Sequence, residues 1–217
     1  MSELPAAALF RLAWRPPWRD APPSSGGALG RWDEDCLLPD AVAPAGAKPF
    51  ARVWACWNEL WLAFSVEVRG KKQVRPYPEQ FWLGDCVELG IDARDVRTAH
   101  RLSKFCHHFV ILPPSGGKRP RDASAFLADD SPAEPADPGA VEVVSRLTEG
   151  GYRVDVVIGA EALSGFDPRE HPRLGFTYHV NDLELGAQYW TFGRDFPIWK
   201  DPSLWGTLIL ARDEEEG

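Results

Sequence analysis

Short runs in which apolar and polar residues alternate follow one another through most of the chain. A period of two is typical of β-strands with one buried face, and the turn residues between the runs favour antiparallel neighbours. The runs cover residues 50–57, 60–68, 85–92, 104–112, 141–147, 151–158, 173–182, 187–192 and 205–211. This pattern predicts a protein built almost entirely of β-strands.

Two of the connections are short enough to be hairpin turns. WNEL at 57–60 can turn between the first two runs, and TEGG at 148–151 can turn between the fifth and the sixth. The only convincing helical fragment, GAEALSG at 159–165, is too short to organise a fold. We therefore predict an all-β protein, an antiparallel β-sandwich of the immunoglobulin-like or jelly-roll-like kind, with one short helix.

Composition changes along the chain and divides it into parts. Residues 1–49 are rich in Pro, Gly and Ala but also hold tryptophans, so we expect this segment to wrap around the same domain and pack on it. Residues 50–212 supply the sandwich, and the polar, Pro- and Gly-rich stretch 113–139 within them is predicted to be a long loop. Residues 213–217, DEEEG, form an acidic tail.

Charge restricts the kinds of partner. The chain of 217 residues has a formal net charge of -8 and a pI of about 5.2, which argues against broad binding to nucleic acid or to an anionic membrane, because phosphates are held mainly by clustered Lys and Arg. Seven basic residues near the middle of the chain could still form a local patch for an anionic partner, although such a run is usually a solvated face. They are Arg94, Arg97, Arg101, Lys104, Lys118, Arg119 and Arg121.

The N-terminal residues and the cysteines give expectations about the cellular location of the protein. No basic segment followed by a long apolar run opens the chain, and no stretch is apolar for long enough to span a bilayer, which favours a cytoplasmic location and leaves an extracellular one open. Four widely spaced cysteines, none in a CxxC pair, are expected to be free buried thiols. They are Cys36, Cys56, Cys86 and Cys106.

The stretch FWLGDCVELGID at 81–92 holds the first candidate site. If it is one uninterrupted strand, Val87, Leu89 and Ile91 face the core. Trp82 and Glu88 then share the opposite face, where a ring and a carboxylate can flank one ligand. Asp85 and Glu88 point to opposite sides and cannot easily serve as the paired carboxylates of a glycosidase.

Four segments in this order resemble family 9 carbohydrate-binding modules. They are FWLGDCVELGID, GGYRVDVVIGAEAL, LGFTYHVND and WKDPSLWGTLIL, and the resemblance covers roughly residues 50 to 210. It implies a β-sandwich that binds sugars without cleaving them. Carried over by position, it also implies that Trp82 and Trp199 stack on a sugar ring and that Glu88 accepts hydrogen bonds from sugar hydroxyls.

This sequence departs from the family pattern at two polar positions. A sugar-binding arginine of the family aligns with Val110, and a nearby asparagine aligns with Phe196; neither replacement can donate a side-chain hydrogen bond. By strand alternation His108 faces the same way as Val110 and is expected to act as a donor instead. The predicted ligand is therefore a mono- or oligosaccharide, held by Trp82, Trp199, Glu88 and His108.

Two other functions stay open at this stage. The histidines could ligate a haem, with His108 and His179 as the axial pair, although consecutive His107 and His108 point to opposite sides of a strand and cannot both grip one ion. The chain could also be a structural or protein-interaction module that has lost sugar binding. No nucleophile elbow, HExxH, phosphate loop or carboxylate pair indicates an enzyme.

Calcium is the remaining cofactor to consider. Relatives carry it at loop carboxylates, and this chain offers suitable oxygens, but no spacing shows which of them converge, and the same residues serve equally well as turn residues that accept backbone hydrogen bonds. No metal site is therefore assigned. The candidate oxygens belong to Asp33, Asp35, Asp92, Asp95, Asn181 and Asp182.

Overall fold

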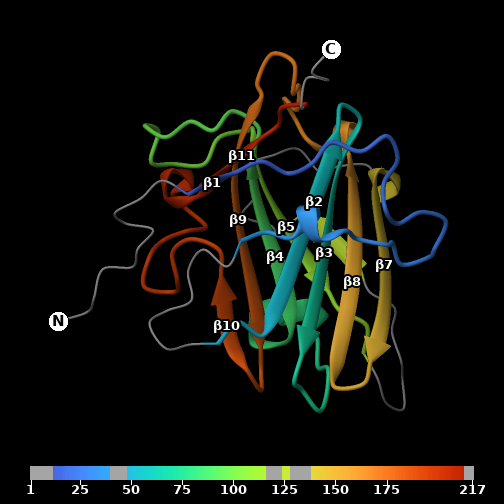
Figure 1. Ribbon diagram of the computed structural model, residues 1–217. Coiled ribbons are helices and arrows are strands. Elements are labelled where there is room, and N and C mark those ends of the chain that lie inside the picture. The colour runs from blue at the N-terminus through green and yellow to red at the C-terminus, as the bar shows by residue number, and fades with distance from the viewer. Residues whose placement is uncertain (1–11, 40–47, 116–123, 128–137, 213–217) are drawn as a thin grey trace.

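Two β-sheets face each other across one apolar core (Figure 1). The computed structural model of the chain describes residues 12–39, 48–115, 124–127 and 138–212. In the first sheet the strand order is β1, β11, β9, β4, β5 and β6, and β10 also pairs with β9. Its strands are β1 (Ala13–Trp14), β4 (Cys86–Asp92), β5 (Cys106–Leu112), β6 (Ser124–Leu127), β9 (Arg173–Asp182), β10 (Gly186–Tyr189) and β11 (Gly206–Ile209).

The second sheet has the order β2, β3, β8 and β7. All neighbouring strands in both sheets are antiparallel except β1 and β11, which are parallel. The antiparallel β-sandwich predicted from the alternating runs is confirmed. The strands of this sheet are β2 (Ala51–Asn58), β3 (Trp61–Arg69), β7 (Val141–Thr148) and β8 (Gly151–Gly159).

Alternation in β4 places its apolar side chains in the core, as predicted. Val87, Leu89 and Ile91 are at most 1% exposed. The two sheets meet at Phe64 of β3 and Phe176 of β9, whose rings stack with centroids 5.1 Å apart. Burial of large apolar side chains from both inner faces is the main force that holds the two layers together.

Both predicted hairpins are present, but two strands, β1 and β6, were not predicted from the sequence. β2 and β3 join through a turn at Glu59 and Leu60, and β7 and β8 join through Glu149 and Gly150. β1 is too short to show a period. β6 lies inside 113–139 and pairs with β5, so the loop prediction is wrong for Ser124–Leu127. The rest of that stretch largely lies outside the described residues, as does 213–217.

Among the described residues the helices are short 3-10 segments, and η2 (Pro78–Leu83) is kinked at Gln80. At 159–165 the predicted short helix is the turn η4 (Ala160–Ala162), since Gly159 and Gly165 flank too few residues for a longer helix. No helix in the described ranges is long and apolar enough to cross a membrane. The other turns are η1 (Glu34–Cys36), η2 (Pro78–Leu83), η3 (Pro138–Ala140) and η5 (Pro202–Leu204).

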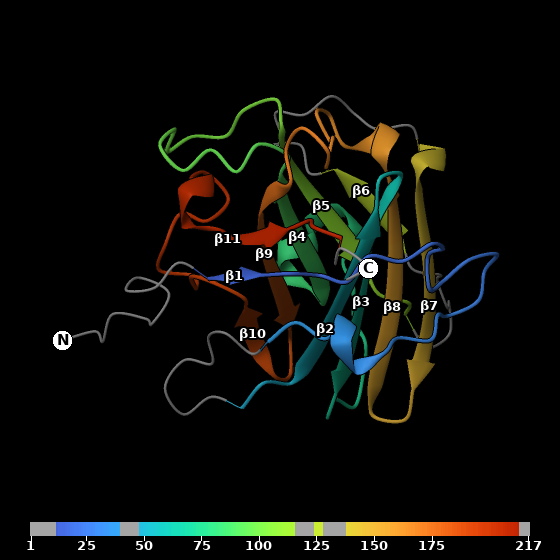
Figure 2. The same cartoon turned by 45° about the horizontal axis from the view of Figure 1, so that its top comes forward.

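The N-terminal segment contacts both sheets. From β1, which pairs with β11, it continues across to the second sheet (Figure 2). There Trp57 donates its indole N–H to the carbonyl of Pro16 at 3.1 Å, and the backbone of Trp18 bridges to Trp57. Further along, Trp32 packs on an apolar cluster on the outer face of the second sheet. The cluster consists of Cys36, Trp54, Cys56, Trp61 and Ala63.

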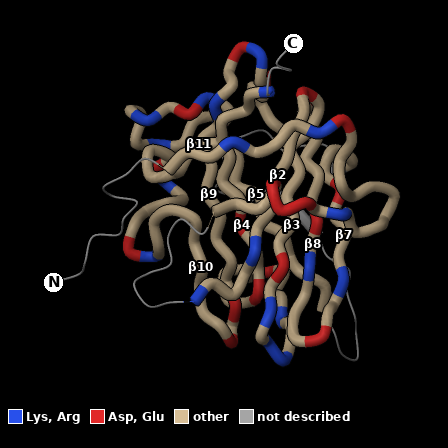
Figure 3. The backbone as a smooth tube through the Cα atoms, viewed as in Figure 1, with Lys and Arg blue, Asp and Glu red and all other residues tan. Residues whose placement is uncertain are grey.

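Basic and acidic residues are interspersed along the backbone trace of the described residues (Figure 3). Two arginines of the suggested basic patch serve the fold: Arg97 donates to the carbonyl of Gly206 at 2.6 Å, and Arg94 donates to the carbonyl of Gly165. Lys118, Arg119 and Arg121 lie outside the described residues. All four cysteines are buried and free, as expected.

Candidate functional site

A pocket of about 430 Å³ opens on the outer face of the first sheet, the face turned away from the core. It contains all four residues predicted to bind a ligand, Trp82, Glu88, His108 and Trp199. The remaining wall residues are Phe81, His179, Asn181, Tyr189, Arg194, Phe196 and Ile198.

Three adjacent strands supply the polar floor. Glu88 on β4 pairs directly with His179 on β9. Gly90, two residues after Glu88 on the same strand, pairs with His108 on β5. Side chains two residues apart on a strand share a face. The register therefore places Glu88, His108 and His179 side by side on the outer face, which alternation within one strand cannot reveal.

Glu88 links the two histidines. Its Oε2 lies 2.8 Å from Nε2 of His108, and its Oε1 lies 2.7 Å from Nδ1 of His179. Burial alone would raise the pKa of this carboxyl, whose side chain is 6% exposed. The hydrogen bonds and charges of the two histidines outweigh burial and lower the pKa from 4.5 to about 2. Glu88 is therefore ionised at neutral pH, and each oxygen already accepts one bond.

Each histidine lies flat against an aromatic ring. His108 stacks on Trp199 with centroids 3.9 Å apart and planes 9° apart, and His179 stacks on Tyr189 at 4.3 Å and 2°. The carboxylate of Glu88 thus orients two layered pairs of rings. Stacking and hydrogen bonding together fix the aromatic wall before any ligand arrives.

Trp82 reaches the pocket from outside the sheet. It belongs to η2, and β4 begins only at Cys86, so the expected uninterrupted strand from 82 to 91 is wrong. Pro78 at the start of η2 favours a helical turn there. The indole is 57% exposed and meets Phe81 edge to face, with centroids 5.1 Å apart.

Trp199 is supported by the connection between β10 and β11. Below it, Trp205 lies edge to face at 6.5 Å and donates its indole N–H to the carbonyl of Ile198 at 2.7 Å. Trp205 crosses the sheet over Gly90, where an added Cβ would lie 2.9 Å from the Trp205 ring. Glycine at this position lets the supporting indole approach the strand.

The two departures from the family pattern fall in different places. Val110 is fully buried and packs with Cys86 and Leu112, beneath Phe81, so it does not reach the pocket. Phe196 does line the pocket and makes a tilted contact with Phe192, with centroids 4.6 Å apart. The wall is more apolar at this point than the sequence pattern of the family implies.

Four polar wall residues were not predicted as sugar contacts. His179 and Asn181 lie two residues apart on β9, so alternation along FTYHVND could have placed them on one face. Tyr189 and Arg194 follow on β10 and the connection after it, and the guanidinium of Arg194 lies near the Tyr189 hydroxyl. No sequence signal links these two residues to β4.

The histidines proposed as haem ligands occupy this same pocket. His108 and His179 both direct a ring nitrogen to Glu88, so axial ligation through those nitrogens would have to break these bonds. His107 points to the other side of β5, as predicted, and accepts a hydrogen bond from the backbone N–H of Ser164 at 2.9 Å. Burial lowers the pKa of His107 to about 4.

The six candidate calcium ligands are spread over separate contacts. Asp92 accepts backbone hydrogen bonds from Arg94 and Val96, as an acidic turn residue does. Asp182 is bound to Lys71, and Asn181 donates to the carbonyl of Gly84. Among the described residues no group of three His, Cys, Asp or Glu side chains is placed to hold a metal ion.

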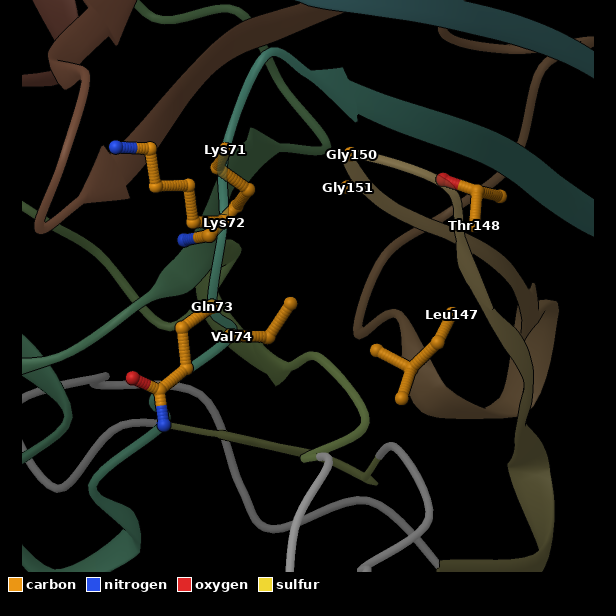
Figure 4. Close-up of a pocket in the computed structure, with 8 residues that line it drawn as sticks. All are labelled: Lys71, Lys72, Gln73, Val74, Leu147, Thr148, Gly150 and Gly151. Atoms are coloured by element: carbon orange, nitrogen blue, oxygen red, sulfur yellow. The ribbon is translucent and has the colours of Figure 1, made fainter.

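A second hollow of about 270 Å³ lies between the start of the β7–β8 turn and residues 71–74. In Figure 4 the side chains of Val74 and Leu147 point into the gap between them, whereas both lysines extend away from Leu147. The ammonium of Lys71 is fully buried, 2.5 Å from Asp85 and 2.6 Å from Asp182. This hollow therefore offers an apolar notch without the converging polar groups typical of a ligand site.

Comparison with known proteins shows the fold. No protein-family model and no curated protein matches the sequence. A family 9 carbohydrate binding module from Caldicellulosiruptor kristjanssonii in complex with cellotriose is 18% identical, with a TM-score of 0.64 over 96% of this chain and 97% of that chain. A structure of such a module from the same organism with glucose is 17% identical, with a TM-score of 0.66 over 94% and 98% of the two chains. The chain therefore has the fold of family 9 carbohydrate-binding modules.

Proposed function

We propose that this protein is a non-catalytic carbohydrate-binding module and that the pocket on the first sheet holds a sugar ring between Trp82 and Trp199. The observation that carries the proposal is the convergence of these two rings, from η2 and from the β10–β11 connection, on one open pocket beside a polar floor. The structural neighbours with the same fold are sugar complexes, which supports this choice of ligand.

The chemistry of the wall suits a pyranose. A sugar ring has apolar C–H faces and a hydroxyl rim, so flat indoles cover the faces while polar groups bind at the edge. His108 covers one face of Trp199 at 3.9 Å, so the sugar packs against the other face. Trp82 has 57% of its surface exposed and supplies the second aromatic surface.

Glu88 acts in this proposal mainly through the histidines. Both of its oxygens accept from imidazoles, and its side chain is only 6% exposed, which leaves little of it for the sugar. Its charge keeps a proton on His108 Nε2 and on His179 Nδ1 and so fixes the orientation of both rings. His108 is then the histidine that holds Trp199 in place.

The arrangement does not suit glycoside cleavage. Glycosidases need two carboxyl groups that flank the scissile bond, and Glu88 is the only carboxylate of the pocket wall among the described residues. Asp85 is fully buried and bound to Lys71. Binding without turnover is the function that these groups support.

The test is a glycan-array screen followed by calorimetry on the best hit. Trp82→Ala and Trp199→Ala should each weaken binding by about 1 to 3 kcal/mol through loss of aromatic contact. Leu60→Ala serves as control, because Leu60 is 71% exposed in the turn between β2 and β3 of the other sheet. Failure of the folded wild type to bind any glycan, or full binding by both tryptophan variants, would refute the proposal.

A further inference from the structure

We infer that the sugar bound in this pocket carries a carboxylate, as a uronic acid does, and that Arg194 is the residue that recognises it. The inference rests on the proposed sugar-binding function and adds to it the chemical class of the ligand. It follows from how charge is distributed around the pocket wall.

The negative charge of the wall is covered and held in hydrogen bonds. Glu88 supplies that charge, and its two oxygens lie 2.8 Å and 2.7 Å from the nitrogens of His108 and His179. Only 6% of the Glu88 side chain is exposed. A ligand carboxylate is therefore kept from direct contact with the oxygens of Glu88.

The positive charge of Arg194 is not covered in the same way. Arg194 lines the pocket, is exposed, and has its guanidinium near the neutral hydroxyl of Tyr189. Within the described ranges no carboxylate lies within 4.0 Å of it, although Asp195 follows directly in the chain. A guanidinium has five N–H donors in a fork that matches the two oxygens of a carboxylate.

A buried nitrogen in the wall also lacks a partner. Nε2 of His179 is buried and makes no hydrogen bond to any described residue, although His179 itself is 92% buried and its Nδ1 is bound to Glu88. Because Glu88 holds the His179 proton on Nδ1, Nε2 is an acceptor, and a sugar hydroxyl can donate to it. His179 stacks on Tyr189, and Arg194 also lies near Tyr189.

The remaining charges near the pocket do not change this balance. Lys200 and Asp195 are exposed, have opposite signs and do not line the pocket. A neutral sugar would place a hydroxyl against Arg194, whereas a uronic acid would place a carboxylate there and form charge-assisted bonds, which are about twice as strong. The pocket therefore favours the acidic sugar of a pair that differs only at this group.

The experiment compares such pairs by calorimetry at pH 7 and low salt. The probes are D-glucuronic acid with D-glucose, and D-galacturonic acid with D-galactose, each titrated into the wild type, Arg194→Gln and Lys200→Gln. Lys200→Gln is the matched control, since it removes an exposed positive charge one residue from Trp199 but outside the pocket wall.

We expect the wild type to bind one acidic sugar about tenfold more tightly than its neutral partner. Arg194→Gln should remove this preference by weakening the acidic sugar about tenfold more than the neutral one, while Lys200→Gln should keep the preference; added salt should weaken the acidic sugar selectively. Equal or tighter binding of the neutral sugars, or an equal loss of both in Arg194→Gln, would overturn the inference and leave the sugar-binding proposal intact. If neither these probes nor any glycan of the array binds, the proposed function fails, and the inference fails with it.

Discussion

Trp199 and His108 lie ring against ring in the pocket wall, with centroids 3.9 Å apart and planes 9° apart. His108 is in turn bound through Nε2 to Glu88 on the neighbouring strand. A side chain on a loop is thereby tied to a side chain on a sheet, and the sheet is the more rigid partner. The position of Trp199 thus depends on residues that a ligand barely touches.

Separate substitutions of His108 should distinguish its two contacts. His108→Ala removes the ring behind Trp199 and should weaken sugar binding by about 1 kcal/mol, the usual contribution of an aromatic pair. His108→Phe retains a stacking ring and should bind more tightly than His108→Ala, but it leaves Oε2 of Glu88 without this donor. We therefore expect it to lose about 1 to 3 kcal/mol of stability to denaturant. Identical binding by both variants and the wild type would show that the stack is irrelevant to the ligand.

Glu88→Gln should lower stability in a pH-dependent way. The folded-state pKa of about 2 lies below the ordinary 4.5, so ionised Glu88 stabilises the fold fully above pH 4.5, and this contribution is lost as the pH falls toward 2. The difference amounts to about 3 kcal/mol at most for a shift of this size. Chemical denaturation from pH 7 to pH 2.5 should show the wild type's advantage over Glu88→Gln shrinking below pH 4.5. Glu79→Gln, on the exposed side of η2, is the control and should show no such trend.

His107 should make the fold sensitive to milder acid. Because burial lowers its folded-state pKa to about 4, from 6.5, the unfolded chain takes up a proton first as the pH falls. Stability should therefore drop between pH 6.5 and pH 4, by up to about 3 kcal/mol. His107→Gln, whose amide oxygen reaches the position of Nε2 and can still accept from Ser164, should lose this part of the pH profile. A profile that His107→Gln leaves unchanged, as we expect of the control His171→Gln, would contradict the assignment.

Gly90→Ala should disturb the pocket from beneath. The new Cβ would lie 2.9 Å from both Trp205 and Thr177, and Trp205 supports Trp199. We expect a loss of about 1 to 3 kcal/mol in stability from overpacking, together with weaker sugar binding. Gly193→Ala is the matched control, because its Cβ would meet Tyr189 only at an ordinary 3.7 Å. Thermal melts measure the stability of both variants, and calorimetry measures their sugar binding. Unchanged binding in Gly90→Ala would show that Trp205 does not contribute to the binding site.

Tryptophans in different surroundings should respond oppositely to truncation. Trp61 is 7% exposed on the outer face of the second sheet, under the N-terminal segment, and Trp61→Ala should cost roughly 3 to 5 kcal/mol of stability through the cavity that it leaves. Trp82 is 57% exposed, so Trp82→Ala should change the unfolding free energy by less than about 1 kcal/mol. Urea denaturation measures both values. A larger loss in Trp82→Ala than in Trp61→Ala would reverse the roles given to the two rings.

The sequence predicted most of the sheets because alternation is a local signal. β8 and β9 carry long apolar periods, and turn residues separate β8 from β7, so their existence follows from the chain alone. β6 was missed because its four residues lie in a polar stretch, and among the described strands it pairs with β5 alone. A short strand that forms mainly because it pairs with a neighbouring strand has little recognisable pattern in its own sequence.

The candidate site was harder to predict because its geometry depends on register. Glu88 and His179 are opposite each other only because β4 and β9 pair with one particular offset, and a shift by one residue would turn them to opposite faces. Trp82 was placed in the pocket for a partly wrong reason, since it lies on η2 and not on the strand. The contact of Arg194 with Tyr189 depends on the path of a connection that has no periodic pattern at all.

The pairing of β1 with β11 joins two segments that lie far apart in the sequence. Ala13 and Trp14 lie opposite Thr207 and Leu208, so β1 cannot pair until β11 has been synthesised. Closing so long a loop is slow. Completion of this edge of the sandwich during synthesis should therefore follow the emergence of β11, and nascent chains arrested before Gly206 should stay sensitive to protease near Trp14.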